Sequence, residues 1–185
     1  MSDLFSIQLQ NRQQQGRDGV WLDLPTTTEQ VQTALRQIGI SSDNPQGLFI
    51  SGYFAEEEKR IAIPYNMVLA SSVDELNFLA ARLETLSAGE RAELNAALQT
   101  PQGELSSIGR ITDFPENVEY YVHLPDVRGP VQLGDYYLNR SGMVDMPDEW
   151  KGGIDTAQFG RYVAHQEQGA FTQYGYLVKS GDEWQ

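Results

Sequence analysis

The chain contains no cysteine, only two histidines, and half as many basic residues as acidic ones. Without cysteine it cannot form disulfides or thiolate metal sites, and this composition is typical of cytoplasmic proteins. His123 and His165 lie far apart in the sequence, and neither belongs to a motif with metal-ligand spacing. The sequence therefore predicts no metal site and no cofactor.

Long apolar runs and targeting signals are also missing from the sequence. No window approaches the roughly 18 consecutive apolar residues of a membrane-spanning helix. The first residues, Met1–Leu4, lack the basic and apolar stretches of a signal peptide. Both observations predict a cytoplasmic protein. No catalytic signature is present, so we expect a binding protein rather than an enzyme.

The net charge limits the choice of partner. Asp and Glu number 26 against 13 Lys and Arg, which gives a formal charge of −13 at pH 7. DNA, RNA and anionic membranes are polyanions, so direct binding to any of them is disfavoured. Two interpretations stay open: the acids keep the protein soluble, or they face a basic groove on a partner. With 40% hydrophobic residues the chain can build packed cores and is not a disordered acidic tail.

Hydrophobic periodicity predicts an α+β fold in three blocks, residues 1–68, 69–112 and 113–185. In the first block, residues 5–9 and 20–24 alternate between apolar and polar side chains. These two runs predict a hairpin, because successive side chains of a strand point to opposite faces.

The rest of the first block predicts one helix and one further strand. Thr27 is followed three residues later by Gln30, which is the spacing of a capping box at a helix start. Gly39 is predicted to end that helix. Residues 47–54 are rich in β-forming side chains, so the block is expected to be a small antiparallel sheet with one packed helix.

The second block is predicted to be helical with an acidic exterior. Ser72 and Ser87 are each followed three residues later by glutamate, so each is expected to begin a helix with a capping box. Leucines at helical spacing follow both positions. A third short helix is predicted over residues 105–111.

The third block is predicted to mix helices and a strand. Residues 131–138 are apolar and aromatic, and Gly142 is predicted to end a helix there. Pro147 is predicted at the first position of a short helix. Residues 171–178 predict one strand.

One further helix is expected between Asp155 and Gly169, with Asp155 as its N-cap. Phe159, Tyr162 and Val163 fall on one apolar face of this helix. We predict that these three side chains form a core or dimer contact.

Four stretches, spread in order over nearly the whole chain, resemble the ArdA family of antirestriction proteins. They are Gly19–Pro25, Ser72–Glu84, Leu133–Tyr137, and Ile154–Arg161, which leads to Phe171–Tyr176. The resemblance implies an elongated homodimer of small domains, with the dimer contact in the C-terminal domain. It also implies that surface carboxylates imitate DNA phosphates and bind type I restriction-modification enzymes at their methyltransferase and specificity subunits.

The candidate phosphate-mimicking residues are acids at outward positions of the predicted helices or in stretches poor in base. They are Asp74, Glu75, Glu84, Glu90, Glu93, Asp113, Glu116, Glu119, Asp126, Asp145, Asp148, Glu149 and Asp155.

The sequence departs from the family in two places. Residues 155–168 correspond to the family's antirestriction motif, which is usually more acidic, but here they contain only Asp155 and Glu167 as acids. Residues 179–185 extend beyond the resemblance, and we expect them to form a disordered end.

Two other functions stay open. The same carboxylates suit an interaction module for another basic DNA-binding protein of a mobile element. A pair of carboxylates about 5–10 Å apart is also the requirement of a glycoside hydrolase, although the sequence does not single out any pair.

Overall fold

The computed structural model describes residues 4–14, 18–41, 45–57, 60–100 and 104–185. The chain divides into two compact units: unit 1 is Met1–Ser87 with Glu104–Pro115, and unit 2 is Ala88–Gly103 with Glu116–Gln185. The described residues contain eight α-helices and two small antiparallel sheets, so the predicted α+β class is confirmed. The predicted division into three domains stays a prediction.

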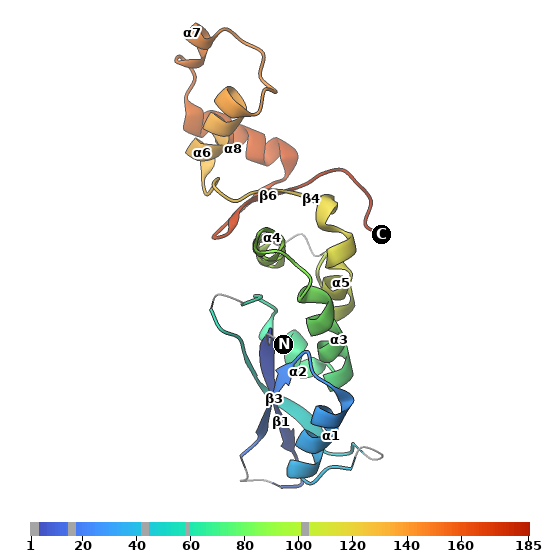
Figure 1. The fold of residues 1–185 in the computed structure, drawn as a ribbon. Coiled ribbons are helices and arrows are strands. Elements are labelled where there is room, and N and C mark those ends of the chain that lie inside the picture. Colours follow the sequence, from blue (N-terminus) through green and yellow to red (C-terminus); the bar gives the residue numbers. More distant parts are fainter. Residues whose placement is uncertain (1–3, 15–17, 42–44, 58–59, 101–103) are drawn as a thin grey trace. The chain divides into compact units, whose positions relative to one another are not determined.

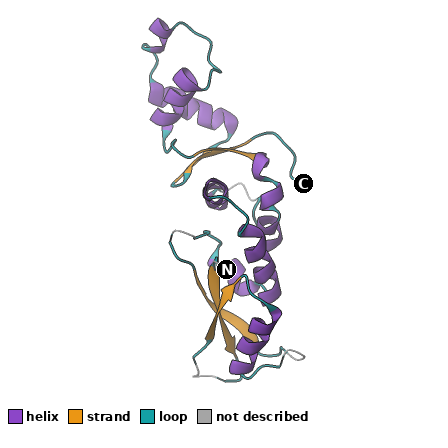
Figure 2. Ribbon diagram, viewed as in Figure 1, coloured by secondary structure: helices purple, strands orange, loops and turns teal. Residues whose placement is uncertain are grey.

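The sheet of unit 1 has the strand order β2-β1-β3, and all its pairs are antiparallel. The strands are β1 (Phe5–Asn11), β2 (Val20–Leu24) and β3 (Leu48–Phe54), shown in Figures 1 and 2. The predicted hairpin is confirmed, with Ile7 opposite Leu22. Both side chains are buried, whereas Trp21 on the other face is half exposed. The alternating pattern therefore predicted the buried face correctly.

Four helices complete unit 1: α1 (Thr28–Gln37), α2 (Tyr65–Ala70), α3 (Val73–Leu83) and α5 (Ile108–Thr112). The capping box of α1 is present as predicted: the Gln30 N–H donates to the Thr27 hydroxyl, and the Gln30 side chain accepts from the Thr27 N–H. Gly39, with φ of +72°, follows the helix end. This left-handed conformation costs glycine little and other residues more.

Helix α3 supplies the leucine core of unit 1. Leu76, Leu79 and Leu83 are fully buried, as their spacing predicted. Asn77 ties the helix to the turn before α1, because its side chain accepts from the Thr26 N–H at 2.7 Å and donates to the Thr26 carbonyl at 3.0 Å.

Helix α5 begins later than the sequence predicted. The predicted start was residue 105, but the helix starts at Ile108 because the Ser107 hydroxyl accepts from the Arg110 N–H and caps it. Leu105 is buried before the helix begins. The apolar pattern predicted correctly that Leu105 is buried, but it did not predict where the helix starts.

The sheet of unit 2 has the strand order β4-β6-β5, from β4 (Tyr121–Leu124), β5 (Ala170–Thr172) and β6 (Gly175–Lys179). The single strand predicted over residues 171–178 is wrong, because the chain turns back at residues 173–174 and forms a hairpin. Gly175 makes this turn with φ of +130°, and a Cβ there would lie 2.5 Å from the Leu124 carbonyl oxygen. Only glycine fits this turn.

The helices of unit 2 are α4 (Ala88–Gln99), α6 (Pro130–Asp135), α7 (Asp148–Lys151) and α8 (Thr156–Glu167). A π-helical turn, η3 (Tyr136–Arg140), extends α6, and Gly142 follows it with φ of +70°. Two 3₁₀ turns, η1 (Phe114–Glu116) and η2 (Val118–Tyr120), precede β4. Pro147 is the N-cap of α7 and not its first residue, one position from the prediction.

Helices α6 and α8 pack backbone to backbone. A Cβ on Gly160 would lie 1.8 Å from the Pro130 carbonyl oxygen, and one on Gly134 would lie 2.1 Å from the Thr156 carbonyl oxygen. Val127, Leu133, Ala164 and Tyr176 form a small core in unit 2. The two glycines are therefore required by packing.

The buried face of α8 differs from the predicted one. Gly160 and Ala164 are its buried residues, whereas Phe159 and Val163 are partly buried and Tyr162 is 61% exposed. Tyr162 is therefore not part of the core of unit 2. Its predicted role in a dimer contact stays a prediction.

The C-terminal segment is ordered, so the expected disordered end is wrong. The Gln185 N–H donates to Asn117 Oδ1 at 2.8 Å, and the Trp184 ring meets the Tyr120 ring edge to face at 5.2 Å. Aromatic packing and a hydrogen bond to the buried Asn117 hold the tail against η2.

None of the helices in the described part of the chain combines the length and the apolar character that crossing a bilayer requires.

Candidate functional site

The predicted carboxylates of unit 1 are exposed on α3 and at the end of α5. Asp74 on α3, Glu84 at the C-cap of α3 and Asp113 after α5 face solvent. Glu75 is exposed as well, but one of its oxygens accepts from the Ser72 N–H at 2.8 Å and from the Ser72 hydroxyl at 2.9 Å. These hydrogen bonds lower the pKa of Glu75 and keep it charged. Glu75 therefore both caps the helix and contributes negative charge.

Glu93 on α4 does not point outward as predicted. Its Oε1 is buried and has no hydrogen-bond partner among the described residues. Burial, followed by repulsion from Glu90, raises the pKa of Glu93 to about 7. At neutral pH this carboxyl is only partly ionised, so it is a poor substitute for a phosphate. Helical spacing predicts which side of a helix a residue lies on, but it does not predict how much other parts of the chain bury the Glu93 side chain.

One hollow in unit 2 gathers two predicted carboxylates with two that were not predicted. Glu116 and Glu119 line it together with Asp182 and Glu183 of the tail, in a volume of about 700 Å³. Its other lining residues are Asn117, Val118, Tyr120, Trp184 and Gln185. The tail acids were missed because the tail was expected to be disordered. We call this feature the acidic hollow.

The remaining predicted acids of unit 2 lie on loops and around α7. Asp126, Asp145 and Glu149 are exposed. Asp148 is exposed but pairs with Lys151 at 2.8 Å, and this contact lowers its pKa. Glu149 lies next to Trp150, which is 68% exposed. The short α7 therefore presents both charge and an aromatic ring to solvent.

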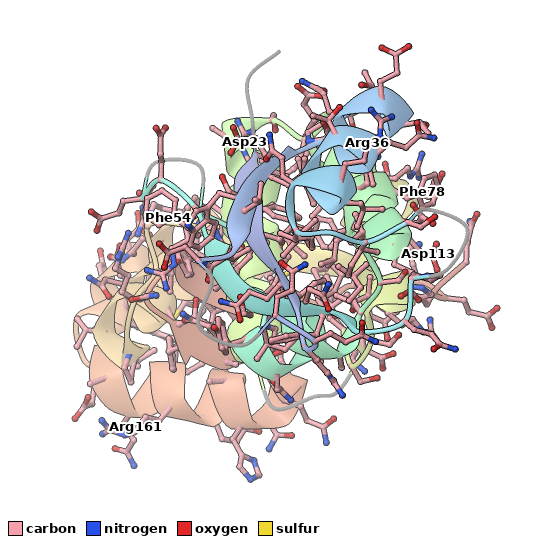
Figure 3. All side chains as sticks on the ribbon, turned by 90° about the horizontal axis from the view of Figure 1, so that it is seen from below. Asp23, Arg36, Phe54, Phe78, Asp113 and Arg161 are labelled. Carbon is pink, nitrogen blue, oxygen red and sulfur yellow. The ribbon has the colours of Figure 1, made fainter. Side chains whose placement is uncertain are left out.

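The segment 155–168 uses both of its carboxylates within unit 2. Asp155 accepts from the Gln158 N–H at 2.9 Å and caps α8, as predicted. Glu167 accepts from the hydroxyl of Tyr176 at 2.9 Å and from the hydroxyl of Tyr137. Burial, and then these bonds, raise the pKa of both tyrosines. Arg161 stands exposed on this helix (Figure 3), so the segment does not form an acidic surface.

The histidines are not placed as metal ligands. His123 Nε2 lies 2.9 Å from the Tyr174 carbonyl oxygen and so joins β4 to the hairpin turn, whereas His165 is exposed on α8. Within the described ranges, no three His, Asp or Glu side chains come together in a way that suits a metal ion.

A family model described as "Antirestriction protein (ArdA)" matches residues 15–178, which is most of the chain. A search of curated proteins gave no match.

Proposed function

The chain belongs to the ArdA family of antirestriction proteins, and we propose that it acts as a DNA mimic in the DNA-binding groove of type I restriction-modification enzymes. The family acts against restriction-modification enzymes in general, and this role involves no catalysis. Our proposal adds three points to this general role. The target is a type I enzyme, the contacts are its methyltransferase and specificity subunits, and the protein binds by imitating DNA.

The observation that carries this proposal is the exposure of the predicted carboxylates in both units. Eleven of the thirteen are exposed: Asp74, Glu75, Glu84, Asp113, Glu116, Glu119, Asp126, Asp145, Asp148, Glu149 and Asp155. The other two, Glu90 and Glu93, are partly buried. The net charge is −13, and the exposed carboxylates that contribute to it are spread over many positions on the surface.

Physical chemistry makes such a surface a substitute for a DNA backbone. A DNA-binding groove is lined with Lys and Arg, and much of its affinity comes from neutralising charge and releasing counterions. Arg meets a carboxylate in the same two-pronged geometry that it uses for phosphate. Phosphate contacts carry no sequence information, so a mimic of this kind is expected to inhibit enzymes of different target sequence.

The carboxylates differ in how well they suit this role. The acidic hollow brings four of them to one surface of unit 2, and α3 carries exposed acids in unit 1. The segment 155–168 is the weakest contributor, because Asp155 is its one exposed carboxylate and Glu167 binds two tyrosine hydroxyls. We therefore assign the main contacts to the hollow and to α3.

We also propose that unit 2 carries a homodimer contact. Val131, Met143, Trp150 and Tyr162 are its most exposed large apolar side chains, each at least 59% exposed. Large apolar side chains at the surface favour association when they form a patch. A protein that sediments as a monomer at all working concentrations would exclude this contact.

The proposal is tested by competition. A type I methyltransferase is bound to labelled cognate duplex, and DNA release is followed by fluorescence anisotropy as the protein is added at two salt concentrations. Mimicry predicts full displacement that weakens as salt is raised. Failure to displace DNA from several type I enzymes would overturn the proposal and leave another basic partner of the mobile element as the alternative.

A further inference from the structure

Strand β2 forms an edge of the sheet in unit 1. The strand order is β2-β1-β3, and within the described part of the chain only β1 pairs with β2. In an edge strand, alternate residues turn their N–H and C=O groups away from the neighbouring strand. These groups are hydrogen-bonded by water or by a strand from another molecule.

A groove of about 810 Å³ follows this edge. On one side it is lined by four consecutive residues of β2, Val20 to Asp23, and on the other by α1 and the turn before it. Side chains of consecutive strand residues point to opposite faces of the sheet, so the groove runs along the edge and not over one face. Figure 3 labels Asp23 on β2 and Arg36 on the neighbouring α1. A groove between an edge strand and a helix suits an added strand.

The lining of the groove is acidic and amphipathic. Asp23 and Glu29 are its two charged residues, and none of its described lining residues is basic. Trp21 is 50% exposed, and its ring reaches across β1 to Gly52 on β3, where a Cβ would lie 3.0 Å from the ring. The ring therefore lies over the open face of the sheet and not over the outer edge of β2. Because its two charged residues are both acidic, the groove complements a basic segment.

We propose that the edge of β2 binds an extended, basic peptide segment of a partner protein by strand addition. The backbone of the segment hydrogen-bonds to the outward groups of β2, and its Lys or Arg side chains contact Asp23 and Glu29. The inference goes beyond the antirestriction proposal and does not depend on it, since it concerns main-chain pairing at one sheet edge.

A second copy of this chain fits the edge less well. Pairing β2 with β2 would bring two acidic edges together on molecules that each carry a charge of −13. Like charges that face each other across paired strands are destabilising. Charge therefore favours a basic partner over self-association.

The test uses hydrogen exchange of the full chain measured by NMR. The probe is a capped hexapeptide in which Lys and Val alternate, and the matched control is the same peptide with an N-methyl group on every residue. The control keeps the charge but loses the donors needed for strand pairing. We expect the probe to slow amide exchange at alternate residues of β2 and the methylated peptide to leave β2 unchanged.

Charge variants provide a second measurement of the same binding. Asp23→Asn and Glu29→Gln should each weaken binding of the probe about two- to fivefold, the size expected for one exposed charge pair. Asparagine can still accept the hydrogen bond that Ser6 donates to Asp23 at 2.5 Å, so folding is retained. Glu57→Gln, an exposed acid outside the groove, is the matched control and should leave binding unchanged.

Three results would overturn the inference. One is the absence of saturable binding of the probe up to millimolar concentration. Another is equal protection of β2 by the methylated peptide, which would indicate charge attraction without strand pairing. The third is protection of β2 that rises with protein concentration in the absence of peptide, which would place a second copy on the edge.

Discussion

Tyr176 donates its hydroxyl to Glu167 Oε2 at 2.9 Å, and through this bond the hairpin of unit 2 is joined to the end of α8. The hydroxyl of Tyr137 donates to the other oxygen of the same carboxylate. The Tyr176 ring belongs to the core of unit 2, so Glu167 serves folding. One of the two acids in the segment 155–168 is therefore turned inward and not toward a partner.

Glu167→Gln is expected to destabilise unit 2 by about 1–3 kcal/mol, because one tyrosine hydroxyl loses its acceptor. Urea denaturation measures this loss, and Gln166→Ala, an exposed neighbour, is the control. Displacement of DNA should be unchanged at concentrations where the variant is folded. A stable variant with weak displacement would instead mean that Glu167 contacts the enzyme.

Stability is expected to depend on pH through Glu93, whose pKa is raised to about 7 by burial and by Glu90. A raised carboxyl pKa means that the folded state holds the proton more tightly, so this contribution to stability is full below about pH 4.5 and is lost as the pH rises through 7. Glu93 is partly exposed, so after allowing for solvent screening the loss is about 1–2 kcal/mol.

Glu93→Gln should remove this part of the pH dependence and should be more stable than the parent above pH 7. Urea denaturation between pH 4.5 and 8 measures both effects. Glu84→Gln, on an exposed residue, is the control and should keep the slope of the parent. Equal slopes for the parent and Glu93→Gln would contradict the assignment.

Gly160→Ala is expected to disrupt the packing of α6 against α8, because the added Cβ would lie 1.8 Å from the Pro130 carbonyl oxygen. The backbone of one helix must then move, at a cost of about 3 kcal/mol or more. Gly152→Ala is the matched control, since its Cβ would have no atom closer than 4.0 Å. Thermal melting compares the two variants, and similar melting temperatures would contradict the close packing.

Removing the tail charges should weaken inhibition if the acidic hollow contacts the enzyme. Asp182→Asn with Glu183→Gln is expected to weaken displacement of DNA about two- to tenfold, since each exposed charge pair contributes about 0.2–1 kcal/mol. Asparagine can still accept the hydrogen bond that Ser180 donates to Asp182 at 3.1 Å. The anisotropy assay measures the change.

Asp18→Asn with Glu57→Gln removes the same number of charges from exposed positions outside the hollow and serves as the control. Equal losses in the two double variants would show that net charge alone matters. No loss in either would exclude the hollow as a contact.

Local sequence patterns predicted much of the fold. The capping boxes at Thr27 and Ser72 and the glycine stop at Gly39 depend on residues close together in the chain, and all three are present. The β1–β2 hairpin followed from alternation alone, because its two strands are neighbours in sequence. The box predicted at Ser87 stays a prediction.

Two predictions failed, one at a local turn and one at a contact distant in sequence. The strand over residues 171–178 is broken by a turn that Thr172 stabilises, since its hydroxyl accepts from the Tyr174 N–H at 3.1 Å and donates to the Gly175 carbonyl at 2.8 Å. The tail is ordered because Gln185 bonds to Asn117. The turn lies inside an apolar run whose periodicity does not mark it, and the tail contact joins segments far apart along the chain.

The sequence by itself determined the family, the excess of acid and the buried leucines of α3, because composition, motif order and periodicity are properties of the chain. Only the tertiary structure decided which carboxylates remain exposed. Asp182 lies with Glu116 in the acidic hollow. By contrast, one oxygen of Glu93 is buried, and Glu167 accepts hydrogen bonds from two tyrosine hydroxyls. The physical reason is that exposure and hydrogen bonding of a carboxylate are set by whatever distant segment packs beside it.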